Sequence, residues 1–303
     1  MIHGIINVKK EKGFTSHDVV AKLRRITKQK KIGHTGTLDP DATGVLPVCL
    51  GKGTRLVDMI TDKEKTYEAV MLLGMTTDTQ DTSGEVLERR STEDLTEDGV
   101  LSVIASFIGD YQQIPPMYSA LKVNGRKLYE LAREGITVER KARDVKILDI
   151  RVLEVDLPRV RMEVSCSKGT YIRTLCYDIG EKLGCGGCME ELIRTKVGIF
   201  ELKDSFTLDE IQTLMDQGMI QKAVKSIDDM FPDYPKVRVR EEFEYLILNG
   251  NEIPAEAIRE EVVFNKKNPE RLLRVYKNDG AFVAVYKKGK NKLRVRKMFY
   301  SEN

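Results

Sequence analysis

The sequence predicts an α+β protein of two domains, in which a larger mixed domain precedes a small, mostly β one. The chain has 303 residues, of which 41% are hydrophobic, and at roughly 150 residues per domain this suits two domains with sizeable cores. Apolar residues recur at helical spacing in some segments and at strand spacing in others. Beyond about residue 231, short strand-like runs predominate.

An amphipathic helix is expected near the N-terminus, with Ser16 as its N-cap and its end near Thr27. Apolar side chains recur there at helical spacing, at Val19, Val20, Leu23 and Ile26. Residues 22–31 carry six basic side chains and no acid. Such a stretch suits contact with a phosphate backbone, although a solvated helix face is an equally good reading.

A loop and two strands should follow this helix. Residues 33–44 contain three glycines, a proline and several Thr and Asp residues, which favour turns and local side-chain to backbone hydrogen bonds. Residues 45–50 and 66–73 are short, mostly apolar runs bounded by turn residues. They are predicted to be buried strands.

Residues 114–143 predict an exposed, basic hairpin and short helix. Pro115 and Pro116 exclude a helix interior at the start of this segment. A short helical stripe follows, formed by Leu128, Leu131 and Ala132, and several basic residues come after it. A surface insertion without a role is the alternative.

A half-buried strand and a second helix come next. Residues 160–166 alternate between apolar and polar side chains, and Gly169 breaks the pattern. Helical spacing then continues from Ile172 until Gly184. Arg173 falls in the first turn, where the helix dipole disfavours a cation by about 0.3 kcal/mol or more. Such departures from local preference are expected at functional sites.

The last part of the chain reads as a small, mostly β domain with a basic face. A boundary is expected within residues 230–235, and residues 287–297 carry seven basic side chains. In the strand predicted at 292–296, alternation puts apolar residues on one face and three cations on the other, namely Lys292, Arg294 and Arg296.

Composition limits the other classes of function. The apolar run of the first ten residues is too short to predict a signal peptide or a membrane helix, and no longer run follows. The five cysteines do not suggest a disulfide framework, so a cytoplasmic protein is expected. Residues 51–54 resemble a phosphate loop only superficially, because Leu46 and Gly53 stand where glycine and Ser or Thr are needed. Three histidines leave little material for a metal site or a Ser-His-Asp triad. Cys185 and Cys188 have thiol-ligand or redox spacing, but a zinc site would need two more ligands, and only Cys166 and Cys176 are near in sequence.

Four segments together resemble the TruB family of pseudouridine synthases. The loop from Gly33 to Leu46 resembles the family's signature loop, residues 65–68 its tyrosine motif, and residues 168–173 its arginine motif. Residues 118–133 resemble the RNA-gripping insertion of its stand-alone bacterial members. One departure is Glu11, which stands where the family usually has proline.

The resemblance implies a pseudouridine-synthase fold, with a mixed, largely antiparallel central sheet flanked by helices. The catalytic domain would span residues 1–231, with an RNA-binding insertion at about 112–143, and residues 232–303 would form a PUA-like RNA-binding domain. It also implies site-specific isomerisation of uridine 55 in the T-loop of tRNA, by base flipping and without a guide RNA. No cofactor, metal, membrane or obligatory protein partner is expected, and the enzyme is expected to be monomeric.

The catalytic residues implied are Asp39, Tyr67 and Arg173. A guanidinium within about 4–6 Å would keep the Asp39 carboxylate ionised, lowering its pKa by roughly 1–3 units, and orient it bidentately. Asp39 could then attack the sugar, attack C6 of uracil, or abstract a sugar proton. Tyr67 could stack on the flipped base, and His34 could occupy the place that the base leaves.

The remaining residues predicted to bind substrate come from the signature loop and three other segments: Gly33, Thr35, Gly36, Thr37, Leu38, Lys10, Tyr171, Lys122, Asn124, Arg126 and Lys127. Three rival functions are disfavoured by the sequence. The presence of Asp39, Tyr67 and Arg173 argues against an RNA-binding protein of the same fold without catalysis, and the insertion argues against a guide-dependent relative of the dyskerin kind. An Asp-dependent glycosidase would need a second carboxylic acid, and none stands out.

Overall fold

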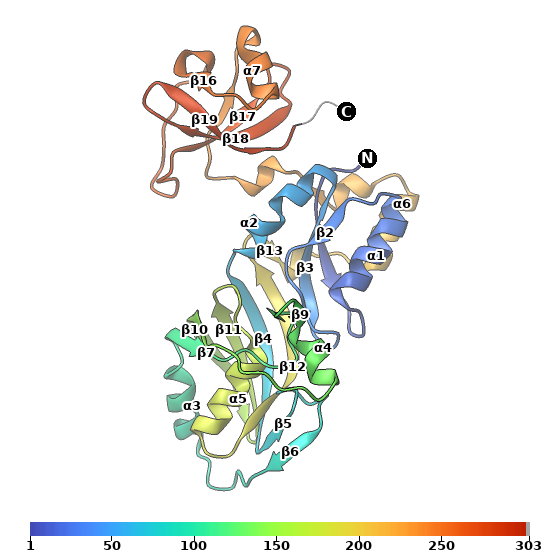
Figure 1. Ribbon diagram of the computed structural model, residues 1–303, viewed down its shortest axis with the longest axis vertical. Coiled ribbons are helices and arrows are strands. Elements are labelled where there is room, and N and C mark those ends of the chain that lie inside the picture. Colours follow the sequence, from blue (N-terminus) through green and yellow to red (C-terminus); the bar gives the residue numbers. More distant parts are fainter. Residues whose placement is uncertain (301–303) are drawn as a thin grey trace.

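The structure, a computed structural model that describes residues 1–300, contains two main β-sheets, the larger flanked by helices (Figure 1). Within residues 1–300 the larger sheet has ten strands, ordered β14-β1-β3-β12-β4-β11-β10-β7, with β2 beside β3 and β13 beside β12. These strands are β1 (Gly4–Lys10), β2 (Ile32–His34), β3 (Thr43–Leu50), β4 (Lys65–Leu73), β7 (Gly109–Gln113), β10 (Arg143–Asp156), β11 (Arg159–Cys166), β12 (Gly187–Val197), β13 (Phe200–Glu201) and β14 (Val224–Lys225).

The larger sheet is mixed and largely antiparallel, as predicted. Its two halves meet where β12 runs parallel to β3, with Ile193 opposite Thr43 and Arg194 opposite Gly44. Gly44 has φ +103°, and a Cβ there would lie 2.3 Å from the backbone oxygen of Arg194. Glycine is therefore required at the end of the signature loop, because a side chain would separate the two halves.

Helices cover the two halves of this sheet separately. The α-helices within residues 1–300 are α1 (Ser16–Thr27), α2 (Val57–Thr61), α3 (Glu97–Ala105), α4 (Leu128–Arg133), α5 (Ile172–Lys182), α6 (Leu208–Asp216) and α7 (Glu244–Leu248). Of these, α7 packs on the C-terminal sheet instead. Leu23 of α1 and Ile211 of α6 belong to one apolar cluster with β1 and β3. Leu175 of α5 and Val100 of α3 belong to another with β4 and β11. Figure 1 shows the two helix pairs beside different strands.

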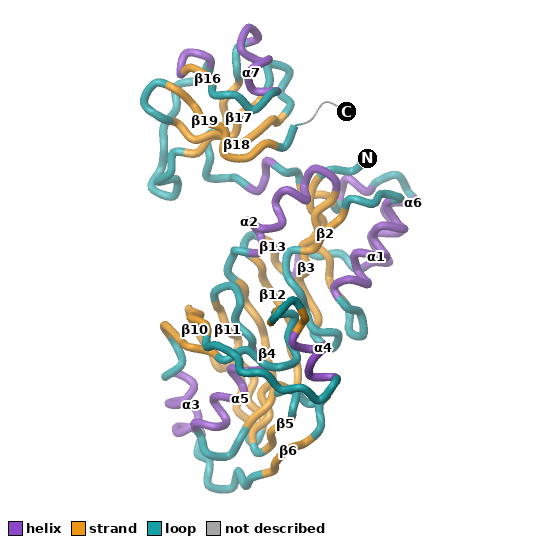
Figure 2. Tube along the Cα trace, in the orientation of Figure 1, coloured by secondary structure: helices purple, strands orange, loops and turns teal. Residues whose placement is uncertain are grey.

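The predicted hairpin and helix are both present between β7 and β10. The hairpin consists of β8 (Lys122–Val123) and β9 (Arg126–Lys127), and α4 follows it directly. Asn124 and Gly125 have φ angles of 51° and 84°, as a tight turn requires. Most of the remaining insertion is loop (Figure 2). A second hairpin, β5 (Met75–Thr77) with β6 (Val86–Arg89), extends the chain after β4.

The C-terminal sheet has a core of its own and also shares one with the larger sheet. Its strands are β15 (Lys236–Arg238), β16 (Ile253–Pro254), β17 (Leu272–Tyr276), β18 (Phe282–Lys288) and β19 (Lys292–Met298). Val237, Leu273 and Tyr286 are buried within it. Phe299 instead joins an apolar cluster with Ile5 of the larger sheet and Phe231 of the connecting segment. The two sheets are therefore in apolar contact.

Two details differ from the sequence prediction. Thr15, not Ser16, caps α1, because its side chain accepts from the backbone of Asp18 and the Asp18 carboxylate bonds back to Thr15. The apolar face predicted for residues 292–296 is also incomplete. Leu293 is buried but Val295 is 37% exposed, although both pair with β18 in the same register and so lie on one face of β19. Among residues 1–300, no helix is both long and apolar enough to cross a membrane.

The contact between α5 and β12 yields a stability test. A Cβ on Gly180 would lie 2.2 Å from the backbone nitrogen of Gly187, so Gly180→Ala should lower the free energy of unfolding by about 2–3 kcal/mol despite the better helix propensity of alanine. In the control Gly33→Ala, the new Cβ lies 3.6 Å from its nearest neighbour and stability should hold. Urea denaturation of both variants tests this, and equal stability would contradict the close packing.

Candidate functional site

The signature loop between β2 and β3 is held from two sides. From α1, the Ser16 hydroxyl accepts a hydrogen bond from the backbone N–H of Leu38 at 2.9 Å. From β12, the guanidinium of Arg194 donates to the backbone oxygens of Gly36 and Thr37, at 3.3 and 3.5 Å, and to that of Val45 at 2.7 Å. Arg194 is 2% exposed, so the loop rests on a buried cation that backbone oxygens satisfy.

Two further predicted site residues are buried, namely Thr35 in the loop and Lys10 at the end of β1. Thr35 is buried, and its hydroxyl donates to the backbone oxygen of Pro47 at 3.1 Å. Lys10 is also fully buried; its ammonium donates to the backbone oxygens of Pro40 and Glu11, at 2.9 and 3.1 Å. Burial lowers the pKa of Lys10 to about 8, although the Asp39 and Asp41 charges oppose this. Lys10 thus supports the loop from beneath.

The predicted ion pair between Asp39 and Arg173 is formed. Nε of Arg173 lies 3.0 Å from Oδ2 of Asp39, and the second amino group of the guanidinium lies 3.3 Å from Oδ1. The Arg173 side chain is 6% exposed whereas that of Asp39 is 41% exposed. The geometry is bidentate, as expected, and the carboxylate remains reachable from solvent.

The loop between β5 and β6 provides further partners for Arg173. The guanidinium donates to the backbone oxygen of Thr79 at 2.9 Å, and the Asp81 carboxylate lies 3.5 Å away. On the next residue of α5, the Thr174 hydroxyl donates to the Gln80 side chain at 2.7 Å. A second carboxylate therefore shares the guanidinium with Asp39.

The pKa of Asp39 differs from the expectation. Burial raises it above its ordinary value, and the Asp81 charge adds to this effect, whereas Arg173 and Lys10 oppose it. The sequence prediction of a lowered pKa was wrong because it counted the arginine alone, without the desolvation and the neighbouring acid.

Tyr67 lies on β4 opposite Arg194 of β12 and is 8% exposed. Burial raises the pKa of its hydroxyl, an effect that the Arg194 charge opposes. The ring belongs to the same apolar cluster as Leu38 of the loop. Arg194 thus links the two residues: it lies opposite Tyr67 in the sheet and donates to the loop that carries Asp39.

His34 ends β2, and its ring centroid lies 5.6 Å from that of His17 on α1. The Nδ1 atom of His34 accepts a hydrogen bond from the backbone of Gly36 at 3.3 Å. Burial, together with the charges of His17 and Arg194, lowers the pKa of His34. Its imidazole is therefore neutral at pH 7.

Tyr171 is the N-cap of α5, and Gln113 fixes its backbone. The Gln113 amide donates to the Tyr171 oxygen at 3.0 Å and accepts from the Tyr171 N–H at 2.8 Å. Gln113 is 1% exposed and ends β7, where the insertion begins. This pair sets the start of α5, and hence the direction of Arg173 two residues later.

The structure does not bring the predicted insertion residues to Asp39. Lys122, Asn124 and Arg126 are exposed; Arg126 pairs with Glu134, and the Lys127 ammonium bonds the Tyr129 hydroxyl at 3.2 Å. The backbone of the insertion does reach the site, because the Tyr118 oxygen accepts from Arg173 at 2.8 Å. The insertion therefore contacts Arg173 through its backbone at Tyr118, whereas the four predicted side chains lie further along the insertion.

Sequence reasoning missed four residues that shape this site: Ser16 in its role at the loop, Asp81, Gln113 and Arg194. Arg194 had a detectable signal, since it occupies an inward position on a strand between buried Leu192 and Val197. Gln113 and Asp81 had none, because a polar residue at the end of a strand and an aspartate among Thr, Ser and Gly residues are both ordinary.

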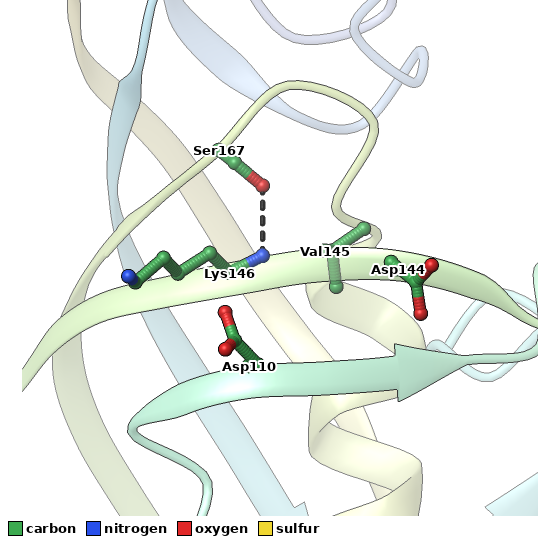
Figure 3. Close-up of a pocket in the computed structure, with 5 residues that line it drawn as sticks. All are labelled: Asp110, Asp144, Val145, Lys146 and Ser167. Atoms are coloured by element: carbon green, nitrogen blue, oxygen red, sulfur yellow. Dashed lines mark hydrogen bonds between the residues drawn. The ribbon is translucent and has the colours of Figure 1, made fainter.

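Other chemistry-bearing groups lie elsewhere. A hollow of about 370 Å³ is lined by Asp110, Asp144, Val145, Lys146 and Ser167, where the Lys146 backbone donates to the Ser167 hydroxyl at 2.8 Å (Figure 3). It includes none of the predicted site residues. All five cysteines are free and buried. In the described part of the chain, no group of three His, Cys, Asp or Glu residues could hold a metal ion.

Sequence comparisons identify the family. Residues 24–172 match the N-terminal domain model of TruB family pseudouridylate synthase, and residues 173–231 match the tRNA pseudouridylate synthase B C-terminal domain. A tRNA pseudouridine synthase B of Clostridium perfringens strain 13 is 44% identical over 99% of this chain and 100% of its own length. One from Lachnoclostridium phytofermentans is 52% identical over 94% and 95%, respectively.

Solved structures agree with these matches. A Cbf5-Nop10-Gar1 complex contains a chain with a TM-score of 0.73 and 29% identity, covering 99% of this chain and 85% of that one. An H/ACA RNP bound to a substrate RNA containing 2'-deoxyuridine gives 0.71 and 27%, with coverage of 98% and 85%. The ten-stranded mixed sheet is thus the predicted pseudouridine-synthase fold, and the chain belongs to the TruB family of pseudouridylate synthases.

Proposed function

We propose that this enzyme isomerises uridine 55 in the T-loop of tRNA to pseudouridine through a mechanism that depends on Asp39. The observation that carries the proposal is the bidentate pair between Asp39 and the buried Arg173, in which the carboxylate stays 41% exposed. An oriented, solvent-reachable carboxylate is what attack on a nucleotide requires. The names of the curated relatives support tRNA as the substrate.

The residues around the pair suit an isomerisation. Breaking the bond between C1′ and N1 develops charge, which an oriented carboxylate can stabilise or take up as a covalent bond. Attack on C1′, attack on C6 and abstraction of a sugar proton would all use Asp39 in this position. Tyr67 would form the apolar wall against which the base stacks, and its un-ionised hydroxyl would exchange a proton at carbon; its burial and the raised pKa of its hydroxyl support these roles. The reaction changes no oxidation state and transfers no external group.

A target base inside a folded loop must leave its stack before it can react, which costs about a few kcal/mol. His34 is our candidate for filling the vacated place, because its neutral ring adjoins His17 at the edge of the signature loop. The loop residues from Gly33 to Leu38 would contact the flipped nucleotide. Lys122, Asn124, Arg126 and Lys127 of the insertion would grip the RNA around it.

We further propose that residues 1–231 form the catalytic unit, with the insertion at about 112–143, and that residues 232–303 form a PUA-like RNA-binding unit. The insertion favours action without a guide RNA or protein partner, because guide-dependent relatives are expected to lack it. We also propose that the enzyme is cytoplasmic and monomeric.

Incubation of the purified protein with unmodified tRNA and no additives, followed by mapping of pseudouridine, tests this function. Asp39→Asn should still bind tRNA but lose turnover by at least about a thousandfold, because an amide cannot act as a nucleophile or carry the charge. Asp41→Asn is the matched control, since Asp41 is an exposed carboxylate on the same loop, and it should keep near-normal activity.

Near-normal turnover by Asp39→Asn would remove Asp39 from the mechanism. Absence of pseudouridine in tRNA with the native protein, but its appearance in another RNA once a guide RNA is supplied, would favour the guide-dependent function instead.

The pH dependence follows from two shifted pKa values. Because the pKa of Asp39 is raised, the reactive carboxylate is lost as pH falls through a value above the ordinary 3.8, and kcat/KM should decline there. Because the pKa of Lys10 is lowered to about 8, its supporting charge is lost as pH rises through about 8. Rates measured from pH 4.5 to 9.5 should form a bell, and Lys10→Met should abolish the basic limb. A basic limb that persists in Lys10→Met would exclude this assignment.

Ser16→Ala tests the positioning of the loop. It leaves the buried Leu38 N–H without its acceptor, which costs about 1–3 kcal/mol and should let Asp39 shift. A displacement near 1 Å can reduce the rate about a hundredfold, so kcat should fall by roughly that factor with KM little changed. Thr27→Val removes another buried hydroxyl of α1, which donates to the backbone oxygen of Leu23 in the same helix, and should keep kcat. Equal rates for both variants would show that Ser16 is only structural.

A further inference from the structure

The outer side of α1 and the turn after it carry positive charge that the protein does not neutralise. Six exposed side chains make up this basic stripe, which consists of Lys22, Arg24, Arg25, Lys28, Lys30 and Lys31. None of them forms an ion pair within residues 1–300. By contrast, Arg159 and Arg161 on β11 are both paired with glutamates. The stripe therefore concentrates a positive potential on one surface.

One end of the stripe is at the candidate site. Ser16 of α1 bonds the signature loop, and His17 contacts His34. From there α1 extends its 12 residues, or about 18 Å, away from the loop. Val19, Val20 and Leu23 face the core, so Arg25 and Lys28 point outward. Asp18, the single acid of this helix, is bonded to the cap Thr15.

The other end of the stripe leads towards the C-terminal sheet. The backbone oxygen of Lys31 accepts from Gly51 at 2.8 Å, and Gly51 begins the short 3-10 helix Gly51–Leu56. In that helix, Arg55 donates to the backbone oxygen of Met298 on β19 at 2.9 Å. In Figure 1, α1 lies at the outside of the molecule, on the same side as the N-terminus. The stripe thus follows a line of contacts from the signature loop to the second sheet.

We propose that the basic stripe binds the phosphates of the base-paired stem that adjoins the target loop of the RNA substrate. The inference rests on the proposed function: with a uridine held at Asp39, the neighbouring stem would lie along α1, whose first turn contacts the signature loop. Guanidinium and ammonium groups in a row recognise the spacing and charge of a phosphate backbone without reading sequence. The stripe would therefore hold the stem in register while the loop presents its base.

Two triple variants separate this role from general electrostatics. The first, Arg25→Gln/Lys28→Gln/Lys31→Gln, changes three exposed side chains of the stripe that form no side-chain hydrogen bond within residues 1–300. The control, Arg89→Gln/Lys146→Gln/Lys182→Gln, removes the same charge from exposed positions on β6, β10 and α5. Affinity for unmodified full-length tRNA is measured by fluorescence anisotropy between 50 and about 300 mM salt, in an Asp39→Asn background to prevent turnover. Steady-state rates are measured in the native background.

The stripe variant should reduce the slope of log K against log salt by about 2–3, since each lost phosphate contact contributes close to one. It should raise KM at least tenfold at fixed salt and leave kcat at saturating tRNA unchanged, because the phosphates lie outside the reacting centre. The control should keep the slope and the KM of the native enzyme.

Native affinity and slope in the stripe variant, an equal loss in the control, or a fall in kcat at constant KM would each overturn the inference while leaving the function intact. A native enzyme that forms no pseudouridine in tRNA would overturn both.

Discussion

The guanidinium of Arg173 is the group on which the site depends. It is 6% exposed and is bonded to three separate segments, namely the signature loop through Asp39, the insertion through the Tyr118 oxygen, and the β5–β6 loop through Thr79 and Asp81. A cation buried to this extent is strongly unfavourable unless its donors are satisfied. The three segments therefore have to be in place together, and none can move away without leaving a buried donor unpaired.

The same arrangement sets the pKa of Asp39 through opposing effects on its carboxylate. Arg173 and Lys10 favour its ionised form, whereas desolvation, Asp81 and Asp41 disfavour it. Lys10 is itself depressed to about 8 by burial, so the support it provides is sensitive to pH. An isolated arginine and aspartate in water would show neither effect, because both come from the surrounding low-dielectric structure.

Local features of this protein could be predicted from the sequence, and features that depend on strand neighbours could not. The helix at 16–27, the strands around 45–50, 66–73 and 160–166, and the pairing of Asp39 with Arg173 follow from periodicity, turn residues and motifs. Arg194 acts on the signature loop only because β12 lies between β3 and β4. That order is a property of the whole sheet, so no local pattern reveals it. The raised pKa of Asp39 was not predicted either, because it depends on burial and on the nearby Asp81, and both depend on the folded structure.

The apolar cluster shared by Ile5, Phe231 and Phe299 has a consequence for how the protein can be divided. Phe299 stacks on Phe282, with ring centroids 5.5 Å apart, and both adjoin Phe231. Removing the last seventy residues would remove part of this cluster and expose apolar surface to water, which favours aggregation. A shortened protein would therefore lose solubility as well as the RNA contacts that we propose for the second sheet. Single substitutions in the full-length protein therefore test the roles of the second sheet better than truncation does.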